Sequence, residues 1–368
     1  MPYFLVGYED GQVPDPMALL QVLNSLAKAE DASRPTTLAT CCEGRLFDAG
    51  VEVPETATAT DLSGANRYFG WYYGNADDLG SNLDSLRAKR PDQPLSVTEY
   101  GAGGAITMHS DNPLGGLPDS RWRKQPEEYA SYIHEKNWAT ISSRPYLWGS
   151  WIWNAFDFAT TIRREGDADD INTKGLVTYD RKVRKDAYYF YKANWTQAPM
   201  VYITGRRYVD RAYRVTPVRV YSNTPSTELF VNGKSMGLLE NCPNRVCEWP
   251  RVKLNKGSNE IVAHGLVEER VVKDSLEWSL GKDASSSVRI DSGALLAGDA
   301  GERKFGSDTY FTGGTSGTLD TQPHYGQLPR FPKVEGTEDR DIVASYREGT
   351  FSYRIPLDNG HYKLTLTF

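Results

Sequence analysis

The sequence of 368 residues is short of several residue types and patterns that would define its class. It has only four cysteines and five histidines, and no Cys-x-x-Cys or paired-histidine motif is spaced for zinc. No apolar run approaches the roughly 20 residues that a membrane span needs. There is no cluster of lysine and arginine, and the net charge is −6, which argues against a nucleic-acid partner. We therefore expect no metal, no membrane span and no nucleic acid.

The few cysteines form two close pairs. Cys242 and Cys247 lie in "NCPNRVC" and could close a short disulfide loop in an oxidising compartment, although their spacing alone leaves this open. Cys41 and Cys42 end an apolar stretch, where we expect buried thiols.

Neither end of the sequence has the features of a domain end. The first residues, "MPYFLVGYEDGQ", lack the basic segment and cleavage site of a signal peptide and enter a strand-like run at once. The last residues, "HYKLTLTF", stop within an alternating strand. We expect the sequence to be a fragment of a longer protein.

Residues 1–197 alternate short apolar runs with helical patterns. Helices are predicted in "DPMALLQVLNSLAKAE", "ADDLGSNLDSLRAKR", "PEEYASYIHEKNWATI" and "RKDAYYFYKANW". Strands are predicted in "PYFLVGYE", "TTLATCC", "RYFGWYYG", "PLSVTEYG" and "YLWGSWIWNAFDFA". This alternation predicts parallel βαβ units, and the nearly continuous apolar strands indicate a sheet covered on both faces. About five strands are visible, fewer than the eight of a closed barrel.

The rest of the sequence has the pattern of β domains. Residues 198–281 alternate with a period of two and carry an Asn232-Gly233 turn, which predicts a β-sandwich of the immunoglobulin-like type. Residues 282–368 are rich in Gly, Ser and Asp, and Asn359-Gly360 predicts a second hairpin between alternating strands. We expect this last domain to be incomplete.

Two glutamates stand where predicted strands end. Glu99 follows an apolar run and precedes the glycines of "YGAGG", and Glu9 ends the first predicted strand. In a βα barrel, side chains at the carboxyl ends of strands face the catalytic mouth. Two carboxylates that face one cleft suit glycoside hydrolysis, in which one acts as acid/base and the other as nucleophile. Without further evidence, a glutamate at a strand end more often forms a loop salt bridge.

Several segments resemble the retaining β-glycosidases of glycoside hydrolase family 2, the β-galactosidase and β-glucuronidase group. "PLSVTEYGAGG" resembles the family's nucleophile strand, "NRYFGWYYG" the sixth strand and "WIWNAFDFA" the last barrel strand. "EDASRPTTLAT" resembles the stretch after the acid/base helix, and "INTKGLVTYDRKVRKDAYYFYKANW" resembles the segment that leaves the barrel. The resemblance covers residues 1–197 and implies the C-terminal part of a (β/α)8 TIM barrel, an α/β fold followed by all-β sandwich domains. Residues 282–368 resemble the first part of a malectin-like carbohydrate-binding module, with Tyr310 and Phe311 either stacked on sugar or buried.

The resemblance implies roles for individual residues. Glu99 becomes the nucleophile and Glu9 the acid/base, with Asp10 as its competitor. The family has asparagine directly before its acid/base, whereas this chain has Tyr8. Other residues are implied in substrate binding, as Tyr72 would hydrogen-bond the nucleophile and Trp153 would form the floor of the sugar site, with Trp148 or Trp151 as alternatives.

Three further residues could bind sugar. His109 either reaches a sugar hydroxyl or is a surface loop residue. Asn172 and Lys174 form an Asn-x-Lys pattern similar to the carboxylate clamp of β-glucuronidases, although Lys174 could instead pair with Asp169 or Asp170.

These residues predict an exo-acting retaining β-glycosidase, β-galactosidase-like, that needs no cofactor and takes an oligosaccharide or glycoside as substrate. The alternatives are a β-glucuronidase of the same family and a non-catalytic carbohydrate-binding scaffold. A periplasmic or extracellular location is expected, with the signal peptide in a missing N-terminal part, and the oligomeric state is not predicted.

Overall fold

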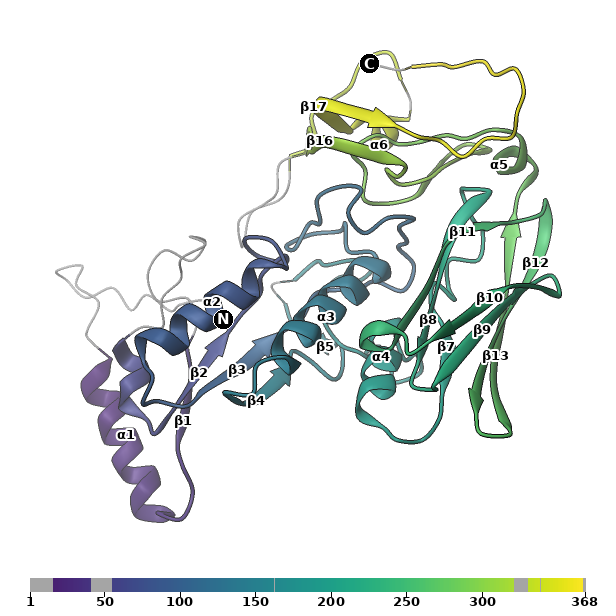
Figure 1. Ribbon diagram of the computed structural model, residues 1–368. Coiled ribbons are helices and arrows are strands. Elements are labelled where there is room, and N and C mark those ends of the chain that lie inside the picture. The colour runs from purple at the N-terminus through teal and green to yellow at the C-terminus, as the bar shows by residue number, and fades with distance from the viewer. Residues whose placement is uncertain (1–15, 41–54, 162, 321–329, 338, 367–368) are drawn as a thin grey trace. The chain divides into compact units, whose positions relative to one another are not determined.

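The computed structural model describes residues 16–40, 55–161, 163–320, 330–337 and 339–366 (Figure 1). The chain divides into two compact units. The first contains Met1–Tyr100 and Thr140–Ile152, and the second contains Gly101–Ala139 and Trp153–Phe368. The predicted strand at residues 2–9, with Tyr8, Glu9 and Asp10, lies outside the described residues.

The first unit contains a parallel sheet of four strands in the order β1-β2-β3-β4. The central strands are largely buried, as expected for a parallel sheet covered on both faces. The parallel pairing confirms the βαβ pattern that the sequence predicts for this region. The strand bounds are β1 Thr37–Thr40, β2 Leu62–Asn66, β3 Leu95–Tyr100 and β4 Leu147–Ile152.

Four helices lie where apolar periodicity predicts them. In α2, the buried Leu79, Leu83 and Leu86 recur at intervals of three or four residues and therefore form one face of the helix. The observed bounds differ from the predicted ones by at most two residues and are α1 Met17–Glu30, α2 Asp78–Lys89, α3 Glu127–Ser142 and α4 Asp186–Trp195.

One strand lies earlier in the sequence than predicted. The aromatic run at residues 67–74 was expected to be a strand, but β2 precedes it, in "LSGAN". After Asn66 the chain turns, and the backbone N–H groups of Trp71 and Tyr72 both donate to the carbonyl of Tyr68 at 3.0 Å. The prediction was wrong because aromatic residues have high strand propensity, whereas the small residues of β2 carry little such signal.

The second unit contains two facing antiparallel sheets, β10-β9-β12-β13 and β11-β8-β7 (Figure 1). Their inner faces share one apolar core, which includes Val218, Leu229, Ile261 and Trp278. Asn232 and Gly233 have φ values of 51° and 75° and join β9 to β10, which confirms the predicted hairpin turn. The strands are β7 Val201–Ile203, β8 Val215–Ser222, β9 Ser226–Val231, β10 Lys234–Glu240, β11 Val246–Lys253, β12 Gly257–Val267 and β13 Arg270–Leu280.

The C-terminal β segment, residues 288–353, contains two antiparallel pairs, the short β14-β15 and the longer β16-β17. The hairpin predicted at Asn359-Gly360 is wrong, because residues 354–366 form no strand. Tyr362, Leu364 and Leu366 are exposed there, so alternation alone does not form a strand without a neighbour to pair with. The remaining bounds are β5 Phe158–Ala159, β6 Ile171–Asn172, β14 Gly298–Ala300, β15 Arg303–Phe305, β16 Phe311–Thr318, β17 Ser345–Tyr353, α5 Lys282–Ser286 and α6 Arg340–Val343.

A disulfide links Cys242 to Cys247. The bond closes the loop between β10 and β11, so the pairing that the sequence left open is present. Cys41 and Cys42 lie outside the described residues.

Candidate functional site

Glu99 is the second-last residue of β3 in the first unit. It pairs in register with Asn66 at the end of β2, and its carbonyl accepts the N–H of Arg67 at 2.8 Å. The half-buried carboxylate therefore lies at the carboxyl end of two neighbouring parallel strands. Catalytic groups of parallel α/β folds are found at this edge.

Tyr68 holds the Glu99 carboxylate. Its hydroxyl donates to Glu99 Oε2 at 2.7 Å, and its side chain is buried. Burial and the adjacent charge of Glu99 raise the pKa of Tyr68 well above its ordinary value. The phenol therefore keeps its proton and acts as a permanent donor.

Tyr72 was expected to hydrogen-bond the nucleophile. It is half-buried, and its ring packs edge-to-face on Tyr68 with 5.2 Å between centroids. Sequence reasoning missed Tyr68, because the strand was predicted at residues 67–74, which placed Tyr68 inside the strand and not two residues beyond its end. The role of Tyr72 stays a prediction.

A buried arginine supports the end of β2. Arg67 Nε donates to the Asn82 side chain at 2.9 Å, and Nη1 donates to the Asn66 carbonyl at 2.8 Å. Burial lowers the pKa of Arg67, and the neighbouring Tyr73 partly opposes this. Thr98 donates to the Asn66 side chain at 2.8 Å, so the strand ends beside Glu99 are linked through side chains as well as through the ladder.

The tryptophans fall in both units. In the second, Trp153 is half-buried and packs edge-to-face on Phe158 at 5.9 Å. Gly101 has a φ of 148°, and a Cβ there would lie 2.6 Å from the Trp153 carbonyl, so only glycine fits. In the first unit, Trp148 and Trp151 are exposed and pack on each other at 5.1 Å.

Asn172 and Lys174 are brought together in the second unit, and both are buried. The Asn172 side-chain oxygen accepts the backbone N–H of Lys174 at 3.1 Å. The Lys174 ammonium lies 3.3 Å from Glu165, which also pairs with Arg163. Pairing of Lys174 with Asp169 or Asp170 is therefore wrong: Glu165 supplies the carboxylate, and Asp169 pairs with Arg123 at the surface.

His109 is a partner in a cluster rather than a surface residue. Its Nδ1 lies 3.0 Å from Glu128, and its ring stacks on Tyr208 with 5.2 Å between centroids. Burial alone would lower the pKa of His109, but the hydrogen bond and charge of Glu128 outweigh it and raise the pKa. Binding of a sugar hydroxyl by His109 stays a prediction.

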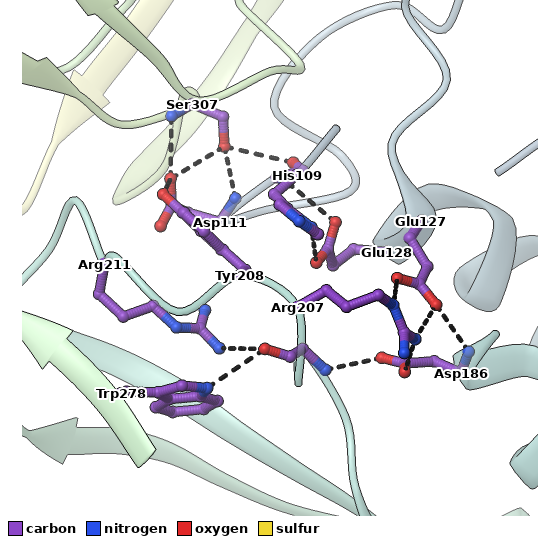
Figure 2. A network of polar contacts seen from close by, with 12 residues as sticks. His109, Asp111, Glu127, Glu128, Asp186, Arg207, Tyr208, Arg211, Trp278 and Ser307 are labelled. Atoms are coloured by element: carbon purple, nitrogen blue, oxygen red, sulfur yellow. Dashed lines mark hydrogen bonds and ion pairs between the residues drawn. The ribbon is translucent and has the colours of Figure 1, made fainter. Parts of the chain in front are cut away.

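Figure 2 shows a polar network in the second unit that sequence reasoning missed. Arg207 pairs with both Glu127 and Asp186, and the Glu127 side chain also accepts the N–H of Asp186 at 2.7 Å. Burial and the charge of Asp186 raise the pKa of Glu127, although Arg207 opposes this. No local sequence pattern predicts the network, because its members lie far apart in the sequence.

The aromatic residues of the predicted carbohydrate module have partners within the second unit. Tyr310 and Phe311 are half-buried. The Tyr310 hydroxyl donates to the Val215 carbonyl, and the Arg347 guanidinium lies 3.4 Å from the centroid of Phe311.

In the part of the chain that the structure describes, no group of three or more His, Cys, Asp or Glu side chains is placed to hold a metal ion. Within the same residues, no helix has the length and apolar character to cross a membrane.

The chain is similar to known glycoside hydrolases. A family model described as "Domain of unknown function (DUF4982)" matches residues 214–272. A β-glucuronidase from Bacteroides fragilis is 41% identical over 248 residues, which is 67% of this chain and 34% of the relative. The crystal structure of an FMN-binding β-glucuronidase from Facaelibacterium prausnitzii L2-6 is 36% identical, with a TM-score of 0.64 over 73% of this chain and 39% of that one. A proposed β-galactosidase from Bacteroides fragilis is 34% identical, with a TM-score of 0.66 over 72% of this chain and 38% of that one. The chain thus spans about a third of the length of the first of these relatives.

Proposed function

Since the chain is homologous to the β-glucuronidases and β-galactosidases of glycoside hydrolase family 2, we propose that it supplies the nucleophile of a retaining exo-β-glycosidase. The observation that carries the proposal is the placement of Glu99. Its carboxylate lies at the carboxyl end of a parallel strand and accepts a hydrogen bond from the buried Tyr68. A nucleophilic carboxylate must stay ionised and oriented, and a fixed neutral donor favours both.

In this mechanism the Glu99 carboxylate attacks the anomeric carbon and forms a covalent glycosyl-enzyme. The carboxylic acid of Glu9 gives its proton to the departing glycosidic oxygen. The resulting carboxylate of Glu9 then takes a proton from water, whose oxygen attacks the anomeric carbon and releases Glu99. Net retention of configuration follows from the two displacements.

For the sugar, we favour a β-glucuronide. The Asn172-x-Lys174 pattern is present, both residues lie on one short segment, and the 41% identical relative is a β-glucuronidase. An ammonium and an amide are suited to bind a sugar carboxylate. Trp153 and His109 are proposed to contact the same sugar, and Tyr72 to assist Tyr68.

A β-galactoside is the second candidate, because one observation favours it. Lys174 is 1% exposed and already pairs with the fully buried Glu165. A cation held by a buried carboxylate is poorly placed to bind a second one, and a galactoside makes no such demand.

The architecture is proposed along the same lines. Residues 1–197 would form the C-terminal part of a (β/α)8 barrel, 198–281 an immunoglobulin-like sandwich and 282–368 part of a malectin-like module. The parallel sheet and the two facing antiparallel sheets support the first two assignments. A periplasmic or extracellular location is supported by the disulfide between Cys242 and Cys247.

The test is covalent trapping. The chain, produced alone and in the longest reading frame that encodes it, is incubated with 2-deoxy-2-fluoro-β-glucuronide and with the matching β-galactoside. We expect Glu99 to be labelled and Glu99→Gln not to be labelled, and the reagent that reacts faster identifies the sugar. A Glu99 that neither reagent modifies in the longest protein refutes the enzyme and favours the non-catalytic carbohydrate-binding scaffold.

A further inference from the structure

Residues 101–126 directly follow the strand that carries Glu99, and the contacts by which the C-terminal β segment holds them include one buried serine. We propose that Ser307 is a positioning residue for two predicted sugar-binding elements. One is His109, which lies on the 101–126 segment, and the other is the Asn172–Lys174 stretch, which the segment contacts. The proposal rests on the proposed function, because it gives His109 and the Asn172–Lys174 stretch a role in substrate binding. Its contacts all lie within the second unit.

Ser307 joins two stretches that lie 196 residues apart in the sequence. Its hydroxyl oxygen accepts the backbone N–H of Asp111 at 2.8 Å and that of Asn112 at 3.2 Å. Its own backbone N–H donates to Asp111 Oδ2 at 3.0 Å, as Figure 2 shows. Because Ser307 is fully buried, water cannot replace these bonds.

The same two stretches pack backbone against backbone. A Cβ on Gly116 would lie 2.4 Å from the Gly293 carbonyl oxygen, so the contact admits only glycine. Arg347 donates to the Gly115 carbonyl at 2.9 Å and pairs through Nε with Asp308 at 2.7 Å. The segment therefore has little freedom to move while these contacts persist.

The 101–126 segment includes or contacts the residues that are predicted to bind sugar. The His109 carbonyl accepts the N–H of Ala297, in the C-terminal β segment, at 2.9 Å. Elsewhere on the segment, Gly104 donates to the Thr173 carbonyl at 3.1 Å, and Gln125 accepts from the Thr173 hydroxyl at 2.7 Å. Thr173 lies between Asn172 and Lys174, so the segment that Ser307 holds also contacts that stretch.

The first test is hydrogen exchange, read by mass spectrometry on peptides that cover residues 105–118 of the full chain. In Ser307→Ala, the buried N–H of Asp111 loses its acceptor and the N–H of Asn112 keeps only the Ser110 hydroxyl, so we expect exchange there to be about tenfold faster. Ser292→Ala is the matched control, because Ser292 lies in the same C-terminal segment but bonds the Tyr353 hydroxyl at 2.8 Å. Ser307→Cys keeps a side chain of similar shape with a weaker acceptor and replaces the alanine variant if that variant does not fold.

The second test separates positioning from a packing role, using the fluoroglycoside that labels Glu99. We expect Ser307→Ala to raise KI severalfold while kinact stays within about twofold, because the residues it positions bind the sugar and do not react. Unchanged exchange in residues 105–118 overturns the proposal whatever the activity, and faster exchange with an unchanged KI overturns the positioning role. A wild-type protein that is not labelled refutes the proposed function and the positioning role that rests on it. Hydrogen exchange in residues 105–118 then shows only whether Ser307 holds the 101–126 segment.

Discussion

The hydroxyl of Tyr68 lies 2.7 Å from Glu99 Oε2. Glu99 is in β3, and Tyr68 lies two residues beyond the end of the neighbouring parallel strand β2. Because the buried phenol keeps its proton, the bond has a fixed direction. A donor of this kind orients the carboxylate without neutralising its charge.

Removal of that donor should slow the covalent step. In Tyr68→Phe, the carboxylate loses a charge-assisted hydrogen bond of about 1.5–3 kcal/mol, so labelling of Glu99 should slow by about 10- to 100-fold. Tyr146→Phe is the control, because Tyr146 donates to Asp84 at 2.6 Å at the surface of the same unit. Equal labelling rates in Tyr68→Phe and the wild type would contradict the assigned role.

The Lys174–Glu165–Arg163 cluster predicts an asymmetry between two variants. Glu165→Gln leaves two cations without the carboxylate that they share, and we expect the free energy of unfolding to fall by about 3–5 kcal/mol. Lys174→Met leaves Glu165 paired with Arg163 and should have a smaller effect. Urea denaturation of both variants measures the difference, and a larger loss for Lys174→Met would show that the cluster is described wrongly.

Asp111 predicts a dependence of stability on pH. Burial raises the pKa of Asp111 to about 6, and the charge of Glu128 adds to this rise. The charge of Arg211 and hydrogen bonds from the Ser307 N–H and the Tyr208 hydroxyl act in the opposite direction. The folded state therefore holds a proton that the unfolded state has lost between about pH 4 and pH 6. The stabilisation from this group is complete below that range and disappears as the pH rises through it, which amounts to about 3 kcal/mol.

Asp111→Asn isolates this effect from the other titrating groups. The difference in unfolding free energy between Asp111→Asn and the wild type should shift in favour of the variant by up to about 3 kcal/mol as the pH rises from 4 to 7. Denaturant titrations of both proteins at several pH values give that difference. Parallel curves would mean that Asp111 titrates normally.

The disulfide should stabilise the sandwich modestly. Cys242 and Cys247 are separated by five positions, and a loop this short contributes about 2 kcal/mol through the unfolded state. The double variant Cys242→Ser/Cys247→Ser should therefore lose about that amount in denaturant unfolding. The wild type treated with a reductant should match it, and a reduced wild type as stable as the oxidised one would argue against the bond.

Features that depend on nearby residues were predictable from the sequence. The leucines of α2 repeat at helical spacing, and Asn232-Gly233 needs only its own backbone preferences to form a turn. The position of Glu99 at a strand end also follows from a local pattern, an apolar run before a glycine cluster. The prediction failed at residues 67–74, where strand propensity competed with a turn and concealed Tyr68 as the partner of Glu99.

Features that depend on distant residues were not predictable. Lys174 had several acidic residues within reach along the chain, and only the path of the loop selects Glu165. Ser307 and Asp111 meet across 196 residues, and neither has neighbours in sequence that indicate the other. A single sequence records propensities and spacing, but it does not record which distant surfaces pack together.

The position of Arg207 bears on how this chain can be inherited. Its guanidinium lies in the sandwich half of the sequence, yet it neutralises Glu127 and Asp186, which precede the sandwich. A shorter gene that stops near residue 197 would remove the arginine that pairs with both carboxylates. Recombination at that boundary would therefore be selected against unless the incoming segment also placed an arginine at this position. We expect the parts of the chain before and after residue 197 to be inherited together.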